Sequence, residues 1–325
     1  MTDRVGVLVV GATPDEAPPG IGPAAEVVDL RYANTADEVA ATIASADAIF
    51  AWRAQRELLE GAWPRADRLR WIQTASAGVD ALLFPALAES EVALTNAGGI
   101  FDAAIAEWVT GMLVLFAKNV LGVLERQRRR EWQHELTEPL AGKRMLVVGV
   151  GGIGRAVARN ALALGMEVRG AGRTTRPGDD LFGVVLGVDE LPEAVEWADY
   201  VVDVLPGTPS TRHTFDAGVF GAMRPGTRFL NVGRGSTVDE GALIEALRGG
   251  RLAGAALDVF EEEPLPAESP LWDLPNVVVF PHMSGDYAGW RESAVELFLE
   301  NLLRFLRDEP LRNVVDKRQG YGSGS

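Results

Sequence analysis

The chain has 325 residues, of which 47% are hydrophobic and 24% charged, with no cysteine and a formal net charge of −15. Its length is typical of two domains, and its composition excludes intrinsic disorder and collagen-like repeats. The absence of cysteine excludes disulfides, thiolate nucleophiles and cysteine-bound metal sites. The negative charge argues against nucleic acid or an anionic membrane as a partner.

The sequence lacks the patterns of an export signal and of a membrane span. Residues 1–11 have neither the long apolar core nor the small-residue cleavage site of a signal peptide. The longest apolar stretch, Trp108–Ala117, is about half of the roughly 20 residues that a bilayer-crossing helix needs. We therefore predict a cytoplasmic protein. The dense basic run Arg126–Arg130 is interpreted as the solvated end of a helix.

Short apolar runs alternate with helical patterns in the first part of the chain. Runs typical of buried parallel strands lie at Val5–Val10, Asp47–Trp52, Leu69–Gln73 and Val92–Thr95, with a helix predicted at Ala36–Ser45. One long helix is predicted to follow over Phe101–Leu124, since its breakers are only Gly111 and Gly122. This part of the chain therefore reads as a small α/β unit followed by a long helix.

A second and longer α/β series begins after Pro139. Its strands are predicted at Arg144–Gly149, Met166–Ala171, Tyr200–Leu205, Thr227–Val232, Ala253–Phe260 and Val277–Phe280. Its helices are predicted at Ile153–Leu164, Leu191–Trp197, Asp216–Met223 and Asp239–Arg248. Repeated β–α–β units of this kind indicate a parallel, doubly wound sheet with helices on both faces.

A final amphipathic helix is predicted at Glu292–Leu306, and we expect it to pack on the first α/β unit. The prediction is therefore two α/β domains. Residues 1–98 and 287–325 form a smaller, discontinuous substrate-binding domain, and residues 99–286 form a dinucleotide-binding domain. The chain end from residue 320 is expected to be disordered.

A glycine-rich loop follows the first strand of the second series and opens a helix. It has the GxGxxG pattern that binds a dinucleotide, with the glycines allowing a tight turn, close approach of the pyrophosphate and close packing of the helix. The helix N-terminus then offers free N–H groups to the phosphates. An ordinary glycine-rich turn is the alternative reading. The predicted cofactor-binding residues of this loop are Gly149, Gly151, Gly152, Ile153 and Gly154.

The end of the next strand indicates which nicotinamide cofactor is used. An NAD site has Asp or Glu here to bond the ribose hydroxyls, whereas this chain has Gly172 followed by Arg173, Thr174 and Arg176. Guanidinium groups bind a 2′-phosphate through charge-assisted forked hydrogen bonds. We therefore favour NADP(H), with NAD(H) as a possible cofactor and a solvated basic loop as the alternative reading.

Three polar residues follow three different strands of the second series. They are Arg234, Glu263 and His282, and His282 comes directly after an apolar strand. Ligands of doubly wound sheets bind at the carboxyl ends of the strands. The other two histidines, His134 and His213, lie in polar segments and are interpreted as surface residues. No metal site is predicted.

These segments resemble the D-isomer-specific 2-hydroxyacid dehydrogenase family over nearly the whole chain. The motifs that carry the resemblance are Ser76–Asp80, Gly149–Gly154, Leu205–Thr211, Asn231–Asp239, Ala256–Pro266, Pro281-His282 and Asn313–Asp316. Residues Glu263–Trp272 are similar to bacterial NADPH-dependent glyoxylate/hydroxypyruvate reductases. The resemblance implies a Rossmann cofactor domain, a flavodoxin-like substrate domain and hydride transfer between a nicotinamide cofactor and a small 2-keto or 2-hydroxy acid.

The resemblance also implies roles for individual residues. His282 would be the general acid or base, Glu263 its partner, and Arg234 the group that holds the substrate carboxylate and polarises its carbonyl. The backbone N–H groups of Ala77 and Gly78 would bind the carboxylate as well. Ser76, Trp52 and Arg53 would be further substrate-binding residues. Further cofactor contacts implied by the family, besides His282, are Leu205, Pro206, Thr208, Val232, Gly233 and Asp258.

Some features depart from the family pattern or leave alternatives open. After His282 the family usually has Gly and a small residue, whereas this chain has Met283–Tyr287. Trp52 either narrows the pocket or is a core residue. A homodimer is expected by resemblance, in which a Trp such as Trp132 reaches the partner's site in some relatives. The alternative functions are a cofactor-sensing corepressor-like binding protein and a phosphite- or formate-type dehydrogenase, although formate dehydrogenases have Gln in place of Glu263.

Overall fold

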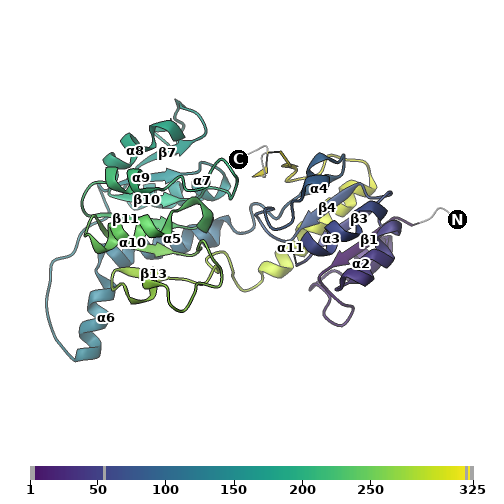
Figure 1. The fold of residues 1–325 in the computed structure, drawn as a ribbon, viewed down its shortest axis with the longest axis horizontal. Helices are drawn as coiled ribbons and strands as arrows, with labels where there is room; N and C mark the ends of the chain where they lie inside the picture. The colour runs from purple at the N-terminus through teal and green to yellow at the C-terminus, as the bar shows by residue number, and fades with distance from the viewer. Residues whose placement is uncertain (1–3, 54–55, 319–320, 323–325) are drawn as a thin grey trace. The chain divides into compact units, whose positions relative to one another are not determined.

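The computed structural model describes residues 4–53, 56–318 and 321–322. It divides into two compact units (Figure 1). Unit 1 consists of the residues up to Phe101 together with those from Tyr287 onward, and unit 2 is Asp102–Asp286. Each unit is built around its own parallel sheet, so the two are described separately.

Unit 1 contains a five-stranded, all-parallel sheet in the order β2-β1-β3-β4-β5. This is the 2-1-3-4-5 order of flavodoxin-like folds, as the resemblance implied. Strand β2, helix α1, helix α3 and helix α4 were not predicted from the sequence. The strands are β1 (Gly6–Val10), β2 (Asp29–Ala33), β3 (Ala48–Ala51), β4 (Trp71–Thr74) and β5 (Ala93–Thr95), and the helices are α1 (Ala24–Val27), α2 (Ala36–Thr42), α3 (Arg56–Ala62), α4 (Pro85–Glu89) and α11 (Trp290–Leu306).

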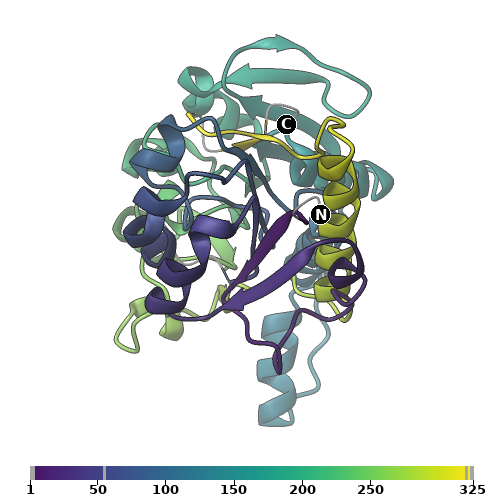
Figure 2. The same ribbon diagram turned by 90° about the vertical axis from the view of Figure 1, so that its right-hand side faces the viewer.

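The sheet of unit 1 is buried on both faces by helices. Successive side chains of a strand point to opposite sides, so each strand contributes to both hydrophobic clusters. In β1, Leu8 and Val10 belong to the cluster beneath α2 and α3, and Val7 and Val9 belong to the cluster that contains Phe298 of α11. Figure 2 shows α11 on one face of the sheet and α2 and α3 on the other. The C-terminal helix therefore completes the N-terminal α/β unit.

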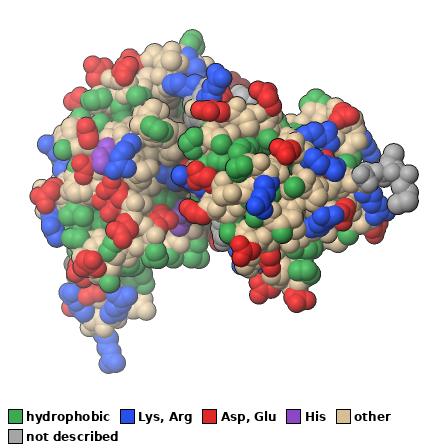
Figure 3. Space-filling model, turned by 45° about the vertical axis from the view of Figure 1, so that its right-hand side comes forward, with side chains coloured by type: hydrophobic (Ala, Val, Ile, Leu, Met, Phe, Trp, Pro, Cys, Tyr) green, Lys and Arg blue, Asp and Glu red, His purple; other side chains and the backbone are tan. Residues whose placement is uncertain are grey.

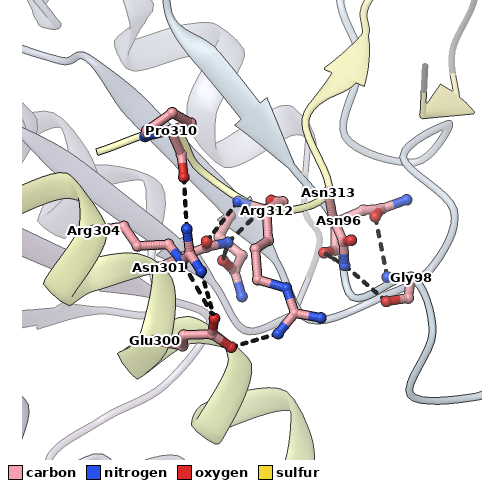
Figure 4. A network of polar contacts seen from close by, with 9 residues as sticks. Asn96, Gly98, Glu300, Asn301, Arg304, Pro310, Arg312 and Asn313 are labelled. Carbon is pink, nitrogen blue, oxygen red and sulfur yellow. Dashed lines mark hydrogen bonds and ion pairs between the residues drawn. The ribbon is translucent and has the colours of Figure 1, made fainter. Parts of the chain in front are cut away.

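Buried polar contacts attach the C-terminal segment to this sheet (Figure 4). Asn301 is fully buried, donates to Oε1 of Gln73 at 2.9 Å and accepts from the backbone of Arg312 at 2.8 Å. Asn313 donates to the carbonyl of Gly98 at 2.7 Å. Buried polar groups without such partners would each cost about 1–3 kcal/mol, so these contacts specify where the segment docks.

The last residues were expected to be disordered, which is wrong for two of them. Tyr321–Gly322 forms the short strand β15, which pairs antiparallel with β14 (Val315–Asp316). Backbone pairing with β14 gives the residues an order that their Gly- and Ser-rich composition does not show. Residues 320 and 323–325 lie outside the described part of the chain.

Unit 2 contains an eight-stranded sheet in the order β13-β12-β11-β10-β6-β7-β9-β8, parallel except for β8. Strands β8 and β9 were not predicted. The strands are β6 (Arg144–Val148), β7 (Glu167–Gly172), β8 (Arg176–Pro177), β9 (Val184–Gly187), β10 (Tyr200–Asp203), β11 (Thr227–Asn231), β12 (Leu252–Leu257) and β13 (Val277–Val279). The helices are α5 (Asp102–Ala117), α6 (Val120–Arg129), α7 (Gly152–Ala163), α8 (Leu191–Trp197), α9 (Ala217–Ala222) and α10 (Glu240–Arg248).

The single helix expected over Phe101–Leu124 is wrong, because the structure has two helices that meet at 62°. The break is at Asn119, whose φ of 47° places it in the left-handed region that Asn tolerates. Neither Gly111 nor Gly122 breaks the helix. No single helix of the described chain is long and apolar enough to cross a membrane, and only the bent pair α5–α6 passes by length and composition.

Helix α6 extends away from the sheet of unit 2 and ends in a basic last turn. Figure 3 shows these basic side chains at the tip of the helix, at the lower left. Arg126 forms an ion pair with Glu135, and Arg129 lies 2.8 Å from Glu125. The basic run is thus a solvated helix end with acidic partners, as predicted.

Several strands of unit 2 end earlier than expected. Strands predicted to reach Leu205, Val232 and Phe260 stop at Asp203, Asn231 and Leu257. The released residues form loops at the carboxyl edge of the sheet. This edge carries the candidate site, and the crevice of the fold lies where the strand order reverses, beside β6.

Candidate active site

The three predicted catalytic residues lie in loops at one edge of the unit 2 sheet. Arg234, Glu263 and His282 follow β11, β12 and β13, and these strands are neighbours in the sheet. Because the strands are parallel, their carboxyl ends meet at the same edge. The sheet therefore brings together residues that are separated by 29 and 19 positions in the sequence, 234 to 263 and 263 to 282.

His282 and Glu263 form a directly hydrogen-bonded pair. The Nδ1 atom of His282 lies 2.7 Å from Oε2 of Glu263, and the backbone N–H of Phe260 donates to Oε1 of the same carboxylate at 3.0 Å. The hydrogen bond to Glu263 raises the pKa of His282 against the lowering effect of burial. Burial raises the pKa of Glu263, but the hydrogen bonds from His282 and Phe260 bring it below its usual value. The pair therefore favours an imidazolium beside a carboxylate.

The backbone of His282 is held in an unusual conformation. Its φ is 49°, and its N–H donates to the carbonyl of Asp258 at 2.8 Å. The carboxylate of Asp258, which is 2% exposed, accepts from the N–H groups of Met283 and Ser284 at 2.8 and 3.0 Å and from the Ser284 hydroxyl at 2.5 Å. Asp258 thus holds the turn that aims the imidazole at Glu263.

Asp258 was predicted to contact the cofactor. In this structure its two carboxylate oxygens accept hydrogen bonds from Met283 and Ser284. The sequence departs from the family pattern at this segment. The departure was visible, but the role of Ser284 as a partner of Asp258 was not, because the two residues are 26 positions apart.

Arg234 lies between two glycines that the packing requires. A Cβ on Gly233 would lie 2.5 Å from the carbonyl oxygen of Leu205, and one on Gly235 would lie 1.8 Å from that of Phe260. No other residue fits this close approach of the loop to its neighbours. The carbonyl of Arg234 accepts from the Asn231 side chain at 3.1 Å, so the loop is tied to the end of β11. Arg234 also contributes, as a minor cause, to lowering the pKa values of Glu263 and His282.

The glycine-rich loop has the shape of a phosphate cradle. Gly149 has a φ of 107°, and a Cβ on it would lie 2.8 Å from the carbonyl oxygen of Val204. A Cβ on Gly154 would lie 1.9 Å from the carbonyl oxygen of Gly149. Helix α7 begins at Gly152, its N-cap residue Gly151 has no side chain to cap it, and the carboxylate of Asp102 lies beside Gly152. The loop therefore fits the pyrophosphate of a dinucleotide, with Ile153 in the first turn of the helix.

The segment after β7 presents basic side chains to solvent. Arg173, Thr174 and Arg176 are exposed, and Arg176 begins the short strand β8 rather than lying in a loop. Thr175 is engaged differently, because its hydroxyl contacts Glu190 and accepts from the N–H of Gly187. Gly172 ends β7, where a Cβ would meet only ordinary contacts at 3.4 and 3.5 Å. A Cβ would thus fit here, but the chain has no side chain at this position.

The other predicted cofactor contacts lie in loops at the same sheet edge. Leu205 is buried and donates its N–H to Asp203 at 2.9 Å, and Val232 is buried as well. The Thr211 hydroxyl donates to the carbonyl of Pro206 at 2.6 Å and lies 2.9 Å from the hydroxyl of Thr208. These internal bonds give the Leu205–Thr211 segment a defined shape beside the glycine-rich loop.

The predicted substrate-binding loop lies in unit 1, after β4. Its carbonyl groups are all occupied, since Ser76 accepts from Ala97 N–H at 2.9 Å, Ala77 from Asn96 Nδ2 at 2.6 Å and Gly78 from the Ser76 hydroxyl at 2.6 Å. Asn313 in turn contacts the carbonyls of Asn96 and Gly98 (Figure 4). Sequence reasoning missed the role of Asn96, although Asn313 was part of a motif.

Trp52 and Arg53 follow β3 in unit 1. The ring of Trp52 is stacked 6.0 Å from that of Trp290 and lies 5.6 Å from that of Phe50. This arrangement agrees with the alternative reading of Trp52 as a packing residue. Arg53 is exposed.

A second His–Glu pair lies in unit 2 and was not predicted. Nε2 of His213 is 2.6 Å from Oε1 of Glu261, and both side chains are about a third exposed. His134 is exposed. Within the described residues, no group of three or more His, Asp or Glu side chains could hold a metal ion.

Comparisons with known proteins show to which family the chain is similar. A model of the NAD-binding domain of D-isomer-specific 2-hydroxyacid dehydrogenases matches residues 110–284. The chain is 32% identical to D-3-phosphoglycerate dehydrogenase of Methanocaldococcus jannaschii over 89% of its own length, and it spans only 55% of that longer relative. It is 33% identical to glyoxylate/hydroxypyruvate reductase B of Salmonella schwarzengrund over 80% of this chain and 81% of the relative.

A solved structure has a similar fold over nearly the whole chain. It is an NADPH-dependent glyoxylate/hydroxypyruvate reductase from Sinorhizobium meliloti in complex with NADP and sulfate. The TM-score is 0.85 at 28% identity, covering 98% of this chain and 100% of the other.

Proposed function

The chain belongs to the D-isomer-specific 2-hydroxyacid dehydrogenase family and is an NAD(P)-dependent oxidoreductase of 2-hydroxy acids, and we propose that it reduces glyoxylate- or hydroxypyruvate-like 2-keto acids with NADPH. The observation that carries the proposal is the 2.7 Å contact between His282 and Glu263 at the sheet edge that also carries Arg234. The comparisons do not favour a corepressor-like binding protein or a phosphite- or formate-type dehydrogenase.

His282 is placed to supply the proton that a reduction needs. When bound, the reduced nicotinamide supplies a hydride to C2 of the keto acid. The oxygen at C2 then develops negative charge and takes a proton from a general acid. Because Nδ1 of His282 faces Glu263, the proton on Nε2 is the one presented to a substrate. Glu263 keeps the ring charged and fixes its orientation.

Arg234 supplies positive charge for the substrate. A guanidinium can bind the carboxylate of a keto acid through a forked pair of hydrogen bonds and stabilise charge that develops at the neighbouring carbonyl. Gly233 and Gly235 hold its backbone close to Leu205 and Phe260, so its position is set by packing. The roles of Ser76, Ala77, Gly78, Trp52 and Arg53 in substrate binding stay predictions.

The preference for NADPH is supported by the segment after β7. Arg173 and Arg176 are exposed near the strand end, with the Thr174 hydroxyl between them, and Gly172 supplies no carboxylate to repel a 2′-phosphate. The similar structure from Sinorhizobium meliloti contains NADP. NAD(H) remains a second cofactor to be measured.

The direct test is a screen of 2-keto acids with NADPH and with NADH, using the wild type and His282→Ala. Loss of a general acid lowers the rate by roughly 10²–10⁴. His213→Ala is the matched control, because it removes a histidine with an equally close glutamate in the same unit. Turnover with none of the keto acids, or equal kcat for His282→Ala and wild type, would overturn the proposal.

We also propose a homodimer that uses the segment after α6. Trp132 is 102% exposed and Leu136 93% exposed, which is unusual for large apolar side chains. Light scattering of the wild type and of Trp132→Ser tests this, with a monomeric wild type as the contrary result. The cytoplasmic location stays a prediction from the sequence.

A further inference from the structure

Asp203 is a carboxyl group buried in the core of unit 2 without a role in the reaction described above. It is the last residue of β10, and its side chain is 0% exposed. Buried carboxyl groups are costly unless they are paired or neutral. The groups around Asp203 therefore indicate whether its carboxyl group is ionised or protonated.

The hydrogen count around Thr237 favours a proton on Asp203. The Thr237 hydroxyl oxygen lies 2.5 Å from Oδ2 of Asp203 and 2.6 Å from the carbonyl oxygen of Arg234. A carbonyl and an ionised carboxylate are both acceptors, and a hydroxyl has one hydrogen to give. Both short contacts are satisfied only if Asp203 donates to Thr237 and Thr237 donates to Arg234. The other oxygen, Oδ1, accepts from the N–H of Leu205 at 2.9 Å.

The charges on the elements around Asp203 are engaged elsewhere. Arg144 of β6 pairs with Asp199, and Arg228 of β11 pairs with Glu138. Arg234 donates to the carbonyl of Gly233. The carboxylates of Asp216 and Asp239 cap helices α9 and α10. Glu240 accepts a hydrogen bond from the N–H of Glu261. Complete burial raises the pKa of Asp203 to about 7, which outweighs the lowering effect of hydrogen bonding with Thr237 and Leu205.

We propose that neutral Asp203 is a positioning residue, which holds the Arg234 loop through a relay from its carboxyl proton to the Thr237 hydroxyl and on to the Arg234 carbonyl. This inference rests on the proposed function of Arg234 as the holder of the substrate carboxylate. When Asp203 loses its proton to solvent, the Thr237 hydroxyl turns to the carboxylate, and the Arg234 carbonyl loses that donor. The loop is then held by one hydrogen bond fewer.

The first test locates the proton without any activity measurement. Infrared difference spectra of the cofactor-free protein are recorded across a pH titration, and the carbonyl stretch of a protonated carboxylic acid is followed. We expect a band that disappears near neutral pH in the wild type, is absent in Asp203→Asn and is retained in Thr237→Ser. No such band at about pH 6 in the wild type would overturn the inference whether or not the chain reduces keto acids.

The second test separates binding from chemistry. Between about pH 6 and about pH 8.5 the wild-type KM for the keto acid should rise about fivefold, which corresponds to one hydrogen bond of about 1 kcal/mol. Asp203→Asn keeps a permanent donor toward Thr237, so its KM should stay at the low-pH value. Thr237→Val should show the raised KM at every pH, and Thr237→Ser should behave as the wild type. The fall of kcat caused by loss of the His282 proton should appear in all four proteins, and any further change in kcat, caused by Arg234, should follow the same pattern among the variants as KM. An equal rise of KM in wild type and Asp203→Asn would overturn the relay.

Discussion

Replacing Glu263 with Gln should make the rate of reduction fall at a lower pH than in the wild type. In the wild type the carboxylate serves two donors, His282 at 2.7 Å and the Phe260 N–H at 3.0 Å. A Gln side chain has only one oxygen. If that oxygen stays with Phe260, its NH₂ group faces Nδ1 of His282 and can donate only to the neutral ring. The variant therefore disfavours the imidazolium that the reaction needs.

The size of the effect follows from the hydrogen bond that is lost. A hydrogen bond to a charged group contributes about 1.5–3 kcal/mol. The side chains of His282 and Glu263 are 49% and 35% exposed, so solvent screening reduces the loss to about 1–1.5 kcal/mol. At about 1.4 kcal/mol per tenfold, the alkaline rate should fall about tenfold relative to wild type. Under acidic conditions His282 is protonated in both proteins, and the difference should be small.

The sign of the dependence follows from the raised pKa of His282. The protonated ring is present at low pH and is lost as pH rises through the folded-state pKa, so reduction fails on the alkaline side. The assay is kcat for glyoxylate reduction from acidic to alkaline pH in the wild type, Glu263→Gln and Glu261→Gln. The last variant breaks the similar pair with His213 and should leave the profile unchanged. Identical profiles for Glu263→Gln and wild type would refute the pairing, and a shift in Glu261→Gln would show a general loss of charge.

Three further predictions concern cofactor choice and stability. Arg173→Ala should raise the KM for NADPH roughly 10–100-fold with little change for NADH. Gly172→Asp, at a position where a Cβ makes only ordinary contacts, should shift the preference toward NADH in steady-state assays. Asn301→Ala should lower the free energy of unfolding by about 2–4 kcal/mol in urea, because it leaves buried partners unpaired. Asp203→Asn should raise the free energy of unfolding at about pH 8 by up to about 4 kcal/mol, because the wild type loses stability as pH rises between the unfolded pKa and the folded pKa of about 7.

Each of these has a clear contrary result. Equal KM changes for both cofactors in Arg173→Ala would mean that the arginine does not distinguish the 2′-phosphate. Wild-type stability of Asn301→Ala would show that water replaces its bonds. A stability gain in Asp203→Asn that is as large at about pH 4 as at about pH 8 would be a packing effect and not a titration.

The parallel sheets and the positions of Arg234, Glu263 and His282 could be predicted because the signals are local. Each residue follows an apolar run, and parallel strands deliver their carboxyl ends to one edge. The glycine-rich loop is likewise contained within a few residues. Strand β2, by contrast, has the mixed sequence Asp29–Ala33, and it is a strand because β1 offers it an edge to pair with. Short β8 and β9 are similarly defined by their pairing.

The helix break at Asn119 shows a different limit. Its residue type permits a left-handed conformation, but many Asn residues inside helices do not adopt one. Contacts beyond the helix accompany the break here, since the Asn119 side chain donates to Glu135 at 2.9 Å and Lys118 donates to the carbonyl of Glu138 at 2.8 Å. Residues after α6 therefore stabilise the bend between α5 and α6, and the hydrophobic pattern of the helix does not show these contacts.

The polar groups that support the site are the hardest part to predict, because their chemistry depends on partners far along the chain. Asp203 visibly interrupts an apolar strand, yet its partner Thr237 is 34 residues away, in a turn that no periodicity marks. At a solvent-exposed strand end the same residue would be an ordinary carboxylate with no effect on Arg234. The meeting of three oxygen atoms, on Asp203, Thr237 and Arg234, is what favours a second proton. A motif therefore predicts which side chains face the substrate, whereas the packing behind them decides their protonation state and hence the pH at which the site is correctly held.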